Sequence, residues 1–195
     1  MLSKAGYCLL FLYLASCCFA NKNVTKPENL TVKKKKERFY KLLLPILNDV
    51  DAKLRMQYLK AKYTLVYQRK SRYIDSLKHV YKVHSDSILL RRLKPHPKSI
   101  TIAQAAIESA WGTSRFFKKG KNIFGVWSFN KRESRIAASE KRGKKTIWMK
   151  KYKSYHEALY DYYFILARAP AFKEFRALKI KTSDPIALVK KLDRY

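Results

Sequence analysis

The feature that most constrains the fold is a helical pattern running from Glu37 to about Leu93. Apolar residues recur there at steps of three and four, which places them on one face of a helix, while basic side chains fill the other faces. The first of them are Phe39, Leu42, Leu43, Ile46, Leu47 and Val50. Pro45 predicts a kink or a restart, and the sequence Lys-Pro-His-Pro at 94–97 predicts a boundary. We therefore expect a helical region at 33–95 with no chemistry of its own, followed by a second part at 96–195.

The second part mixes helices with two strands. The expected elements are a helix at 99–110, strands at 122–129 and 146–152 around a polar loop and a turn at 142–144, a helix at 155–168 and a last helix opening at Pro185. Ser154 and Glu157 have the spacing of a capping box. The predicted fold class is α+β and predominantly helical, with a small two-stranded β-lobe.

The first 20 residues read as a signal peptide. A positive start precedes an apolar run at 5–14 that is too short to span a bilayer. Two processing sites are open: a lipobox at 14–17, which would place a lipid on Cys17, and an ordinary cleavage site after Ala20. Residues 21–32 read as a tether. All three cysteines lie in this leader, so no disulfide is expected in the folded part. The expected location is the periplasm or the cell envelope.

The charge balance predicts polyanionic partners. Lys and Arg number 44 against 14 Asp and Glu, a formal net charge of +30. Nucleic acid, anionic lipid and an acidic cell wall all fit such a surface. The leader and the lack of a nucleic-acid motif argue against nucleic acid. The lysine run at 33–36 is a solvated helix start or a segment attracted to an anionic membrane surface.

The predicted helix at 99–110 carries the candidate catalytic residue. On the helix at 99–110, Ile102, Ala103, Ala106, Ile107 and Ala110 form the stripe expected to be core. Gln104, Glu108 and Trp111 fall on the other side. An indole stacks on sugar rings, and a partly dry cleft raises the pKa of a carboxyl group into the range of a general acid. A plain surface glutamate at a helix end is the alternative interpretation.

The surrounding string resembles a known family. The stretch 102–116, IAQAAIESAWGTSRF, followed by NIFGVW at 122–127 and YKSYHEALYDY at 152–162, is similar to the Bax/FlgJ-type glucosaminidases of glycoside hydrolase family 73. The resemblance covers about residues 33–195. It implies a lysozyme-like α+β fold and cleavage of β-1,4 bonds after N-acetylglucosamine in peptidoglycan. Glu108 matches the family's catalytic glutamate, the proton donor to the leaving oxygen.

The resemblance also implies further site residues. Glycosidases usually pair two carboxylates. Glu140 fits the family's position in the β-lobe, with Glu133 in reserve, and the acetamido group of the substrate is an alternative to either. Tyr195 matches the family's active-site tyrosine. The chain stops there, so we expect the family's last helix to be missing. The predicted substrate-binding residues are Gln104, Trp111, Asn122, Phe124, Gly125, Trp127 and Tyr162, with core packing left open for Phe124, Trp127 and Tyr162.

Two function classes remain at this point. The first is a peptidoglycan hydrolase that needs no metal and no cofactor. The second is a non-catalytic, basic cell-wall-binding protein on a lysozyme-like scaffold. The intact motif around Glu108 favours the hydrolase, and the expected absence of the family's last helix favours the wall-binding protein.

Overall fold

The computed structural model describes residues 31–67, 71–142 and 145–192. The chain divides into residues 1–31 and a compact unit from Val32 onward. The signal peptide, Cys17, the tether up to residue 30 and Tyr195 lie outside the described residues, so these predictions stay as they are. Among the described helices, none is long and apolar enough to cross a membrane.

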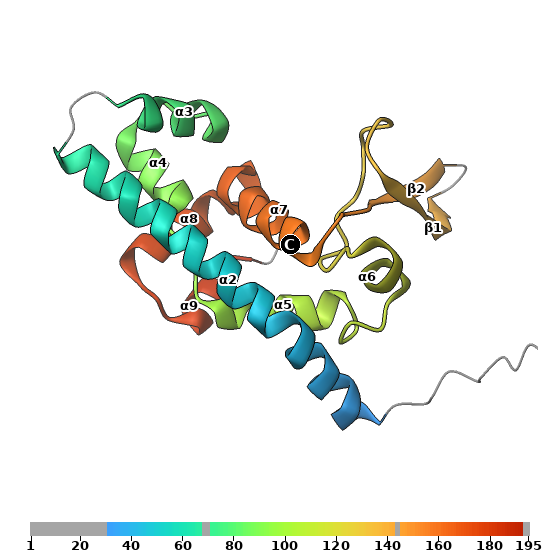
Figure 1. Cartoon of the computed structure of the whole chain (residues 1–195). Helices are drawn as coiled ribbons and strands as arrows, with labels where there is room; N and C mark the ends of the chain where they lie inside the picture. The colour runs from blue at the N-terminus through green and yellow to red at the C-terminus, as the bar shows by residue number, and fades with distance from the viewer. Residues whose placement is uncertain (1–30, 68–70, 143–144, 193–195) are drawn as a thin grey trace, which may run out of the picture. The chain divides into compact units, whose positions relative to one another are not determined.

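The compact unit is predominantly helical with one small hairpin (Figure 1). Its elements are α2 (Val32–Tyr67), α3 (Arg72–Tyr81), α4 (Asp86–Leu93), α5 (Lys98–Glu108), α6 (Arg115–Gly120), β1 (Arg135–Arg142), β2 (Lys145–Lys150), α7 (Tyr155–Arg168), the 3-10 turn η1 (Pro170–Phe172), α8 (Lys173–Lys181) and α9 (Pro185–Val189). The two strands pair antiparallel. The predicted α+β class with a two-stranded lobe is confirmed.

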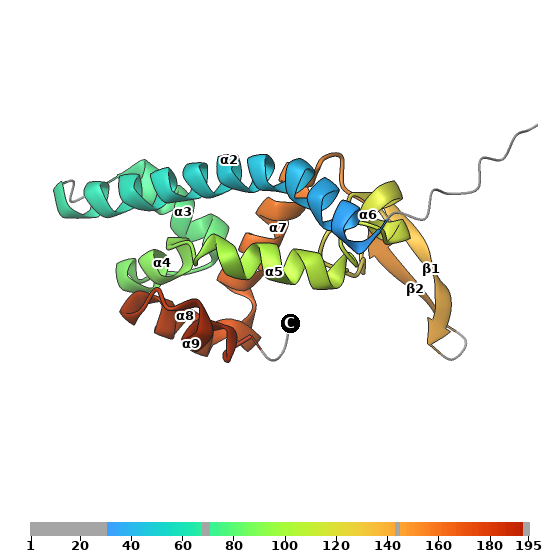
Figure 2. The same ribbon diagram turned by 90° about the horizontal axis from the view of Figure 1, so that it is seen from below.

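Helix α2 packs against both hydrophobic clusters of the unit. Phe39, Leu43, Leu47 and Val50 enter the larger cluster, which α5, α7 and the segment at 123–124 complete. Ala61 enters the smaller cluster, formed with α3 and α4. Figure 2 shows α2 along one edge of the unit, with the other helices on one side of it. Residues of both regions, 33–95 and 96–192, therefore enter the larger cluster, and α2 packs against both clusters.

The helix α2 continues through Pro45, although a restart was one of the two expectations. Proline removes one backbone N–H and its ring crowds the carbonyl four residues earlier. The burial of Leu43 and Leu47 on either side of Pro45 supplies the packing energy that holds the helix there.

The first predicted strand is wrong. Residues 122–129 form a loop in which Ile123 and Phe124 are buried and Trp127 makes an isolated bridge with Met149. The strand β1 lies instead in the segment predicted as a polar loop. Its backbone pairs with β2, and the Arg135 guanidinium lies 4.1 Å from the centre of the Trp148 ring on the facing strand. Cross-strand contacts of this kind, together with the pairing of Ile136 with the buried Met149, stabilise the hairpin.

The predicted core stripe of α5 is only partly right: Ala106 is buried and Ile102 packs on the larger cluster, but Ala103 and Ala110 are exposed. The buried residues are Ile100, Thr101, Ala105 and Ala106, whereas Ile107 is 77% exposed. Thr101 can be buried because its hydroxyl is 2.9 Å from both the His96 ring and the Tyr163 hydroxyl. On an alanine-rich helix this hydrogen bonding outweighs the weak apolar pattern. The short helices α6 and α8 were not expected at all.

Several helix ends match their sequence signals. The Ser154 hydroxyl accepts from the backbone N–H of Glu157, and the Glu157 carboxylate accepts from the N–H of Lys153. The Asp184 carboxylate caps α9 by accepting from Ile186 and Ala187. The capping prediction for α7 and the start predicted for α9 are therefore confirmed.

Pro45→Ala should stabilise the unit. Pro45 is exposed, so alanine leaves no cavity and restores the missing hydrogen bond in the middle of α2. We expect the free energy of unfolding in urea to rise by about 1–3 kcal/mol. Arg38→Ala, at an exposed position of the same helix, is the control and should change it by less than about 0.5 kcal/mol. A loss of stability in Pro45→Ala would show that the fold depends on proline geometry at this turn.

Candidate active site

Glu108 is the last residue of α5, at the exposed end of the helix. The helix stops there because Ser109 caps it: the Ser109 hydroxyl donates to the carbonyl of Ala105 and accepts from the N–H of Gly112. The chain then turns through three residues with positive φ, Ala110, Trp111 and Gly112. This turn ends the helix and leaves the Glu108 side chain at its tip.

The surroundings of Glu108 favour its protonated form. Partial burial raises the pKa of the Glu108 carboxyl group above its usual value. The C-terminal end of a helix carries partial negative charge and acts on this carboxylate in the same direction. A carboxyl group that holds its proton to higher pH while staying accessible is suited to donate that proton.

Gly125 lies against the Glu108 carboxylate. Its φ of +63° is in the left-handed region that glycine adopts without strain. A Cβ added there would be 3.5 Å from Oε2 of Glu108 and 3.9 Å from the terminal carbon of Met149. The backbone of the 122–126 loop thus forms one wall beside the carboxylate. Gly125 was predicted to bind substrate, and the close approach that the structure gives it is to Glu108.

Asn122 fixes that loop. Its side-chain amide donates to the carbonyls of Val126 and Lys150, both at 2.9 Å, and its carbonyl accepts from the N–H of Val126 at 3.0 Å. Lys150 is the last residue of β2, so one buried side chain ties the Gly125 loop to the hairpin. Asn122 was predicted to bind substrate, but its three bonds are internal and it is 1% exposed. It holds the site in place instead.

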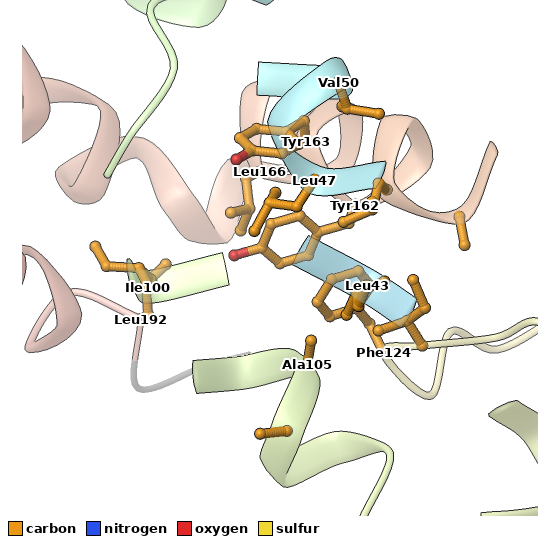
Figure 3. Packing of buried hydrophobic residues seen from close by; sticks show 14 of the residues in the cluster. Leu43, Leu47, Val50, Ile100, Ala105, Phe124, Tyr162, Tyr163, Leu166 and Leu192 are labelled. Atoms are coloured by element: carbon orange, nitrogen blue, oxygen red, sulfur yellow. The ribbon is translucent and has the colours of Figure 1, made fainter. Parts of the chain in front are cut away.

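Two more predicted substrate-binding residues lie in the core. Tyr162 is fully buried and its hydroxyl donates to the side-chain carbonyl of Gln104. Phe124 is also buried and stacks on the Tyr162 ring, with ring centres 4.0 Å apart. Figure 3 shows both rings among Leu43, Leu47 and Ala105. Of the two interpretations left open for Phe124 and Tyr162, packing is the one that the structure gives. Gln104 is half-buried and bonded to this pair.

Trp111 does not continue the helix face of Glu108, because α5 ends three residues earlier. Its half-buried ring packs edge-on against Phe39 and Tyr40 of α2, and the Lys36 ammonium lies 4.9 Å from the ring centre. The contacts that the structure gives Trp111 are thus packing contacts with α2. Its role in substrate binding stays a prediction.

Two aromatic rings beside the Gly125 loop are open to solvent. Trp127 is 42% exposed and Phe129 is 86% exposed, with ring centres 6.1 Å apart. Ser128 between them is buried, because alternate residues of an extended chain point to opposite sides. Phe129 was not among the predicted site residues. The alternation Trp-Ser-Phe was the signal that could have indicated it.

The candidate second carboxylates differ in their surroundings. Glu133 accepts from the Ser128 hydroxyl at 2.6 Å and lies 4.0 Å from the Lys150 ammonium. That ammonium is 2.8 Å from Asp161, which also accepts from the Tyr152 hydroxyl. Glu140 lies in β1, in the stretch where the register between Ala137 and Lys141 shifts. Such bulges redirect side chains and are common beside active sites.

A cavity of about 690 Å³ lies elsewhere, along the face of α7 that carries Tyr160, Asp161 and Phe164. Glu108, Trp127 and Phe129 are not among its lining residues. We therefore place the candidate active site at the end of α5 on its chemistry, and not at this cavity. Within the described residues, no group of three or more His, Cys, Asp or Glu side chains could hold a metal ion.

The chain matches one protein family and is weakly similar to two solved structures. The family model described as "Glucosaminidase: Mannosyl-glycoprotein endo-beta-N-acetylglucosaminidase" matches residues 88–194. A comparison with curated proteins gives no match. Among solved structures, a peptidoglycan hydrolase from Sphingomonas sp. A1 is 19% identical with a TM-score of 0.36, over 60% of this chain and 77% of that one. The catalytic domain of the autolysin Auto from Listeria monocytogenes is 19% identical with a TM-score of 0.33, over 85% of this chain and 67% of that one.

Asn122→Ala should loosen the site and the fold together. The change removes the three hydrogen bonds of a buried side chain, takes the Asn122 donor from the Lys150 carbonyl and leaves the Val126 carbonyl with the N–H of Lys150. We expect the free energy of unfolding to fall by about 2–4 kcal/mol. Asn130→Ala, an exposed asparagine of the same lobe, is the control and should cost less than about 1 kcal/mol. If Asn122→Ala lowers the free energy of unfolding no more than the control does, Asn122 does not hold the 122–126 loop to β2.

Proposed function

The chain belongs to the mannosyl-glycoprotein endo-beta-N-acetylglucosaminidase family of glycoside hydrolases, and we propose that Glu108 is its general acid on peptidoglycan. The proposed cut is the β-1,4 bond after N-acetylglucosamine. The observation that carries the proposal is the placement of Glu108 at the tip of α5, with the Gly125 backbone against its carboxylate.

The proposed reaction follows from this placement. The protonated Glu108 carboxyl donates to the glycosidic oxygen as the bond from that oxygen to the anomeric carbon breaks, and positive charge builds up on the sugar ring. Water then adds to the anomeric carbon and releases one proton. A raised pKa extends the pH range over which Glu108 holds the proton for the first step. A carboxylate or the substrate's acetamido group stabilises the positive charge.

We propose Glu140 as the partner carboxylate. The support for this choice is the sequence, in which Glu140 fits the family's position in the β-lobe. Glu133 is less suited, because its carboxylate already accepts from Ser128 and lies beside Lys150. We propose that Trp127 and Phe129 supply stacking surfaces for sugar rings, which their exposure supports.

We also propose that the protein is exported to the cell envelope. The support is the leader in the sequence, with its short apolar run and two processing sites. A lipid on Cys17 and attraction of the lysines at 33–36 to anionic headgroups would both hold the enzyme near a membrane. These lysines open α2, and three of the four are exposed.

Glu108→Gln should abolish clearing of peptidoglycan in a zymogram. The amide keeps the size of the side chain but has no acidic proton to donate, so we expect the rate to fall by at least about 100-fold. Muropeptides released by the wild type should carry N-acetylglucosamine at the reducing end by mass spectrometry. Glu37→Gln, an exposed glutamate on α2, is the matched control and should clear normally.

Other outcomes of this experiment are decisive as well. A reducing-end or anhydro muramic acid would show that a different bond is cut. If neither protein clears the gel but both bind sacculi, the chain is a wall-binding module and the proposal fails. Equal clearing by wild type and Glu108→Gln would remove Glu108 from the reaction.

The pH profile should show the raised pKa of Glu108. Activity needs the protonated carboxyl group, so it is lost as the pH rises through the pKa of Glu108 in the folded protein. Because partial burial raises that pKa, the alkaline limb of kcat/KM should lie above the ordinary glutamate value of about 4.3. An alkaline limb at or below that value would contradict a general acid in this environment.

A further inference from the structure

The outer face of α2 carries an exposed apolar stripe, in which the Tyr63 ring contacts the exposed Tyr67 ring of the same helix, with ring centres 4.5 Å apart. Met56, Leu59, Tyr63 and Val66 are exposed by 67%, 54%, 62% and 67%. Ala52, also exposed, extends the stripe by one turn. We call these five residues the outer seam of α2. Large apolar side chains are this exposed singly on many proteins, but a row of them over four turns of helix marks an interaction surface.

The spacing of the outer seam is that of a coiled coil. The steps between its members are four, three, four and three residues, which makes Met56 and Tyr63 a positions and Ala52, Leu59 and Val66 d positions of a heptad. The f positions, opposite the seam, are Leu47, Leu54 and Ala61. Leu47 and Ala61 are fully buried, and Leu54 packs on the larger cluster. The buried face therefore anchors α2 in the domain and points the seam outward.

The flanks of the outer seam are cationic. Lys53 and Lys60 occupy e positions, and Arg55 and Lys62 occupy g positions. From Ala52 to Tyr67 the sequence holds no acidic residue. Lys53 and Arg55 pair within the helix, with Asp49 at 2.8 Å and Asp51 at 2.7 Å. The Lys60 ammonium lies 4.7 Å from the centre of the Tyr73 ring. All four cations are exposed at the seam.

We propose that the outer seam binds an amphipathic helix of a partner protein whose e and g positions are acidic. A second copy of this chain does not fit, because a parallel pair sets Arg55 against Lys60 and an antiparallel pair sets Arg55 against Lys62. A lipid surface fits less well, since helices that lie in a membrane interface have a broad apolar face and not a stripe of two residues in seven. An acidic helix satisfies both the narrow stripe and the charges.

The test uses two synthetic helical peptides with leucine at a and d. The acidic peptide has glutamate at e and g, and the basic peptide has lysine there. Fluorescence anisotropy should show binding of the acidic peptide only, and the binding should weaken as salt is added. The double variant Leu59→Gln/Tyr63→Gln should bind it at least about tenfold more weakly. Both positions are exposed, so circular dichroism and peptidoglycan clearing should match the wild type.

Controls separate this surface from others. Ile186→Gln, at a 67% exposed position on α9, is the matched apolar control and should leave peptide affinity unchanged. Lys60→Gln/Lys62→Gln should weaken binding and reduce its salt dependence. Because clearing of peptidoglycan is measured separately, a failure of the peptide to bind the outer seam leaves the assignment of Glu108 unaffected.

Four results would overturn the proposal. The first is no binding of the acidic peptide, and the second is equal binding of both peptides. The third is a dimer in light scattering that Leu59→Gln/Tyr63→Gln dissociates, which would make a second copy the occupant. The fourth is sedimentation with phosphatidylglycerol vesicles that the same variant loses while peptide binding is absent, which would make the surface a membrane contact.

Discussion

The burial of one face of α2 is the interaction on which the rest of the unit depends. Its 36 residues run past both hydrophobic clusters, and α7, α4, α5 and α3 all contact it. Most of the stability of a helix in a protein comes from tertiary packing of its apolar face and not from propensity, so the inner face of α2 links the helix to the core. The helix that carries Glu108 is positioned by this contact.

The end of α5 that carries Glu108 is held by smaller contacts. Ser109 ends α5 directly after Glu108, and Asn122 ties the loop at 122–126 to the end of β2. Glu108 is thus held from two sides, by a helix that belongs to the core and by a loop that belongs to the lobe. Each support uses a buried polar side chain whose bonds are satisfied within the protein, which fixes geometry better than apolar contact alone.

The sequence predicted the fold class and the position of Glu108 because both rest on local signals. The motif around Glu108, the capping box at Ser154 and the cap at Asp184 each act within a few residues.

Prediction from the sequence failed where contacts with distant residues decide the structure. Residues 122–129 have the aromatic content that is typical of a strand. The Phe124 ring instead packs on the Tyr162 ring in the core. The strand β1 looks like a loop because its hairpin buries little. The buried face of α5 follows Thr101, whose partner Tyr163 lies 62 residues further along the chain. The Glu140 side chain and Tyr195 lie outside the described structure, so their assignments still rest on the sequence.

Three cations inside the unit are bound by helix ends and not by acids. Arg92 donates to the carbonyl of Tyr81 at the end of α3, Arg176 to Leu166 and Ala169 at the end of α7, and Lys179 to Lys94 after α4. Within the described residues, none of the three forms an ion pair. Carbonyls at a helix C-terminus carry the partial negative charge that these side chains need. For protein design, the basic residues of this protein therefore fall into two groups. Lysines on the surface can be exchanged to tune solubility or adhesion, whereas these three belong to the architecture, and neutralising them would leave the ends of three helices without donors.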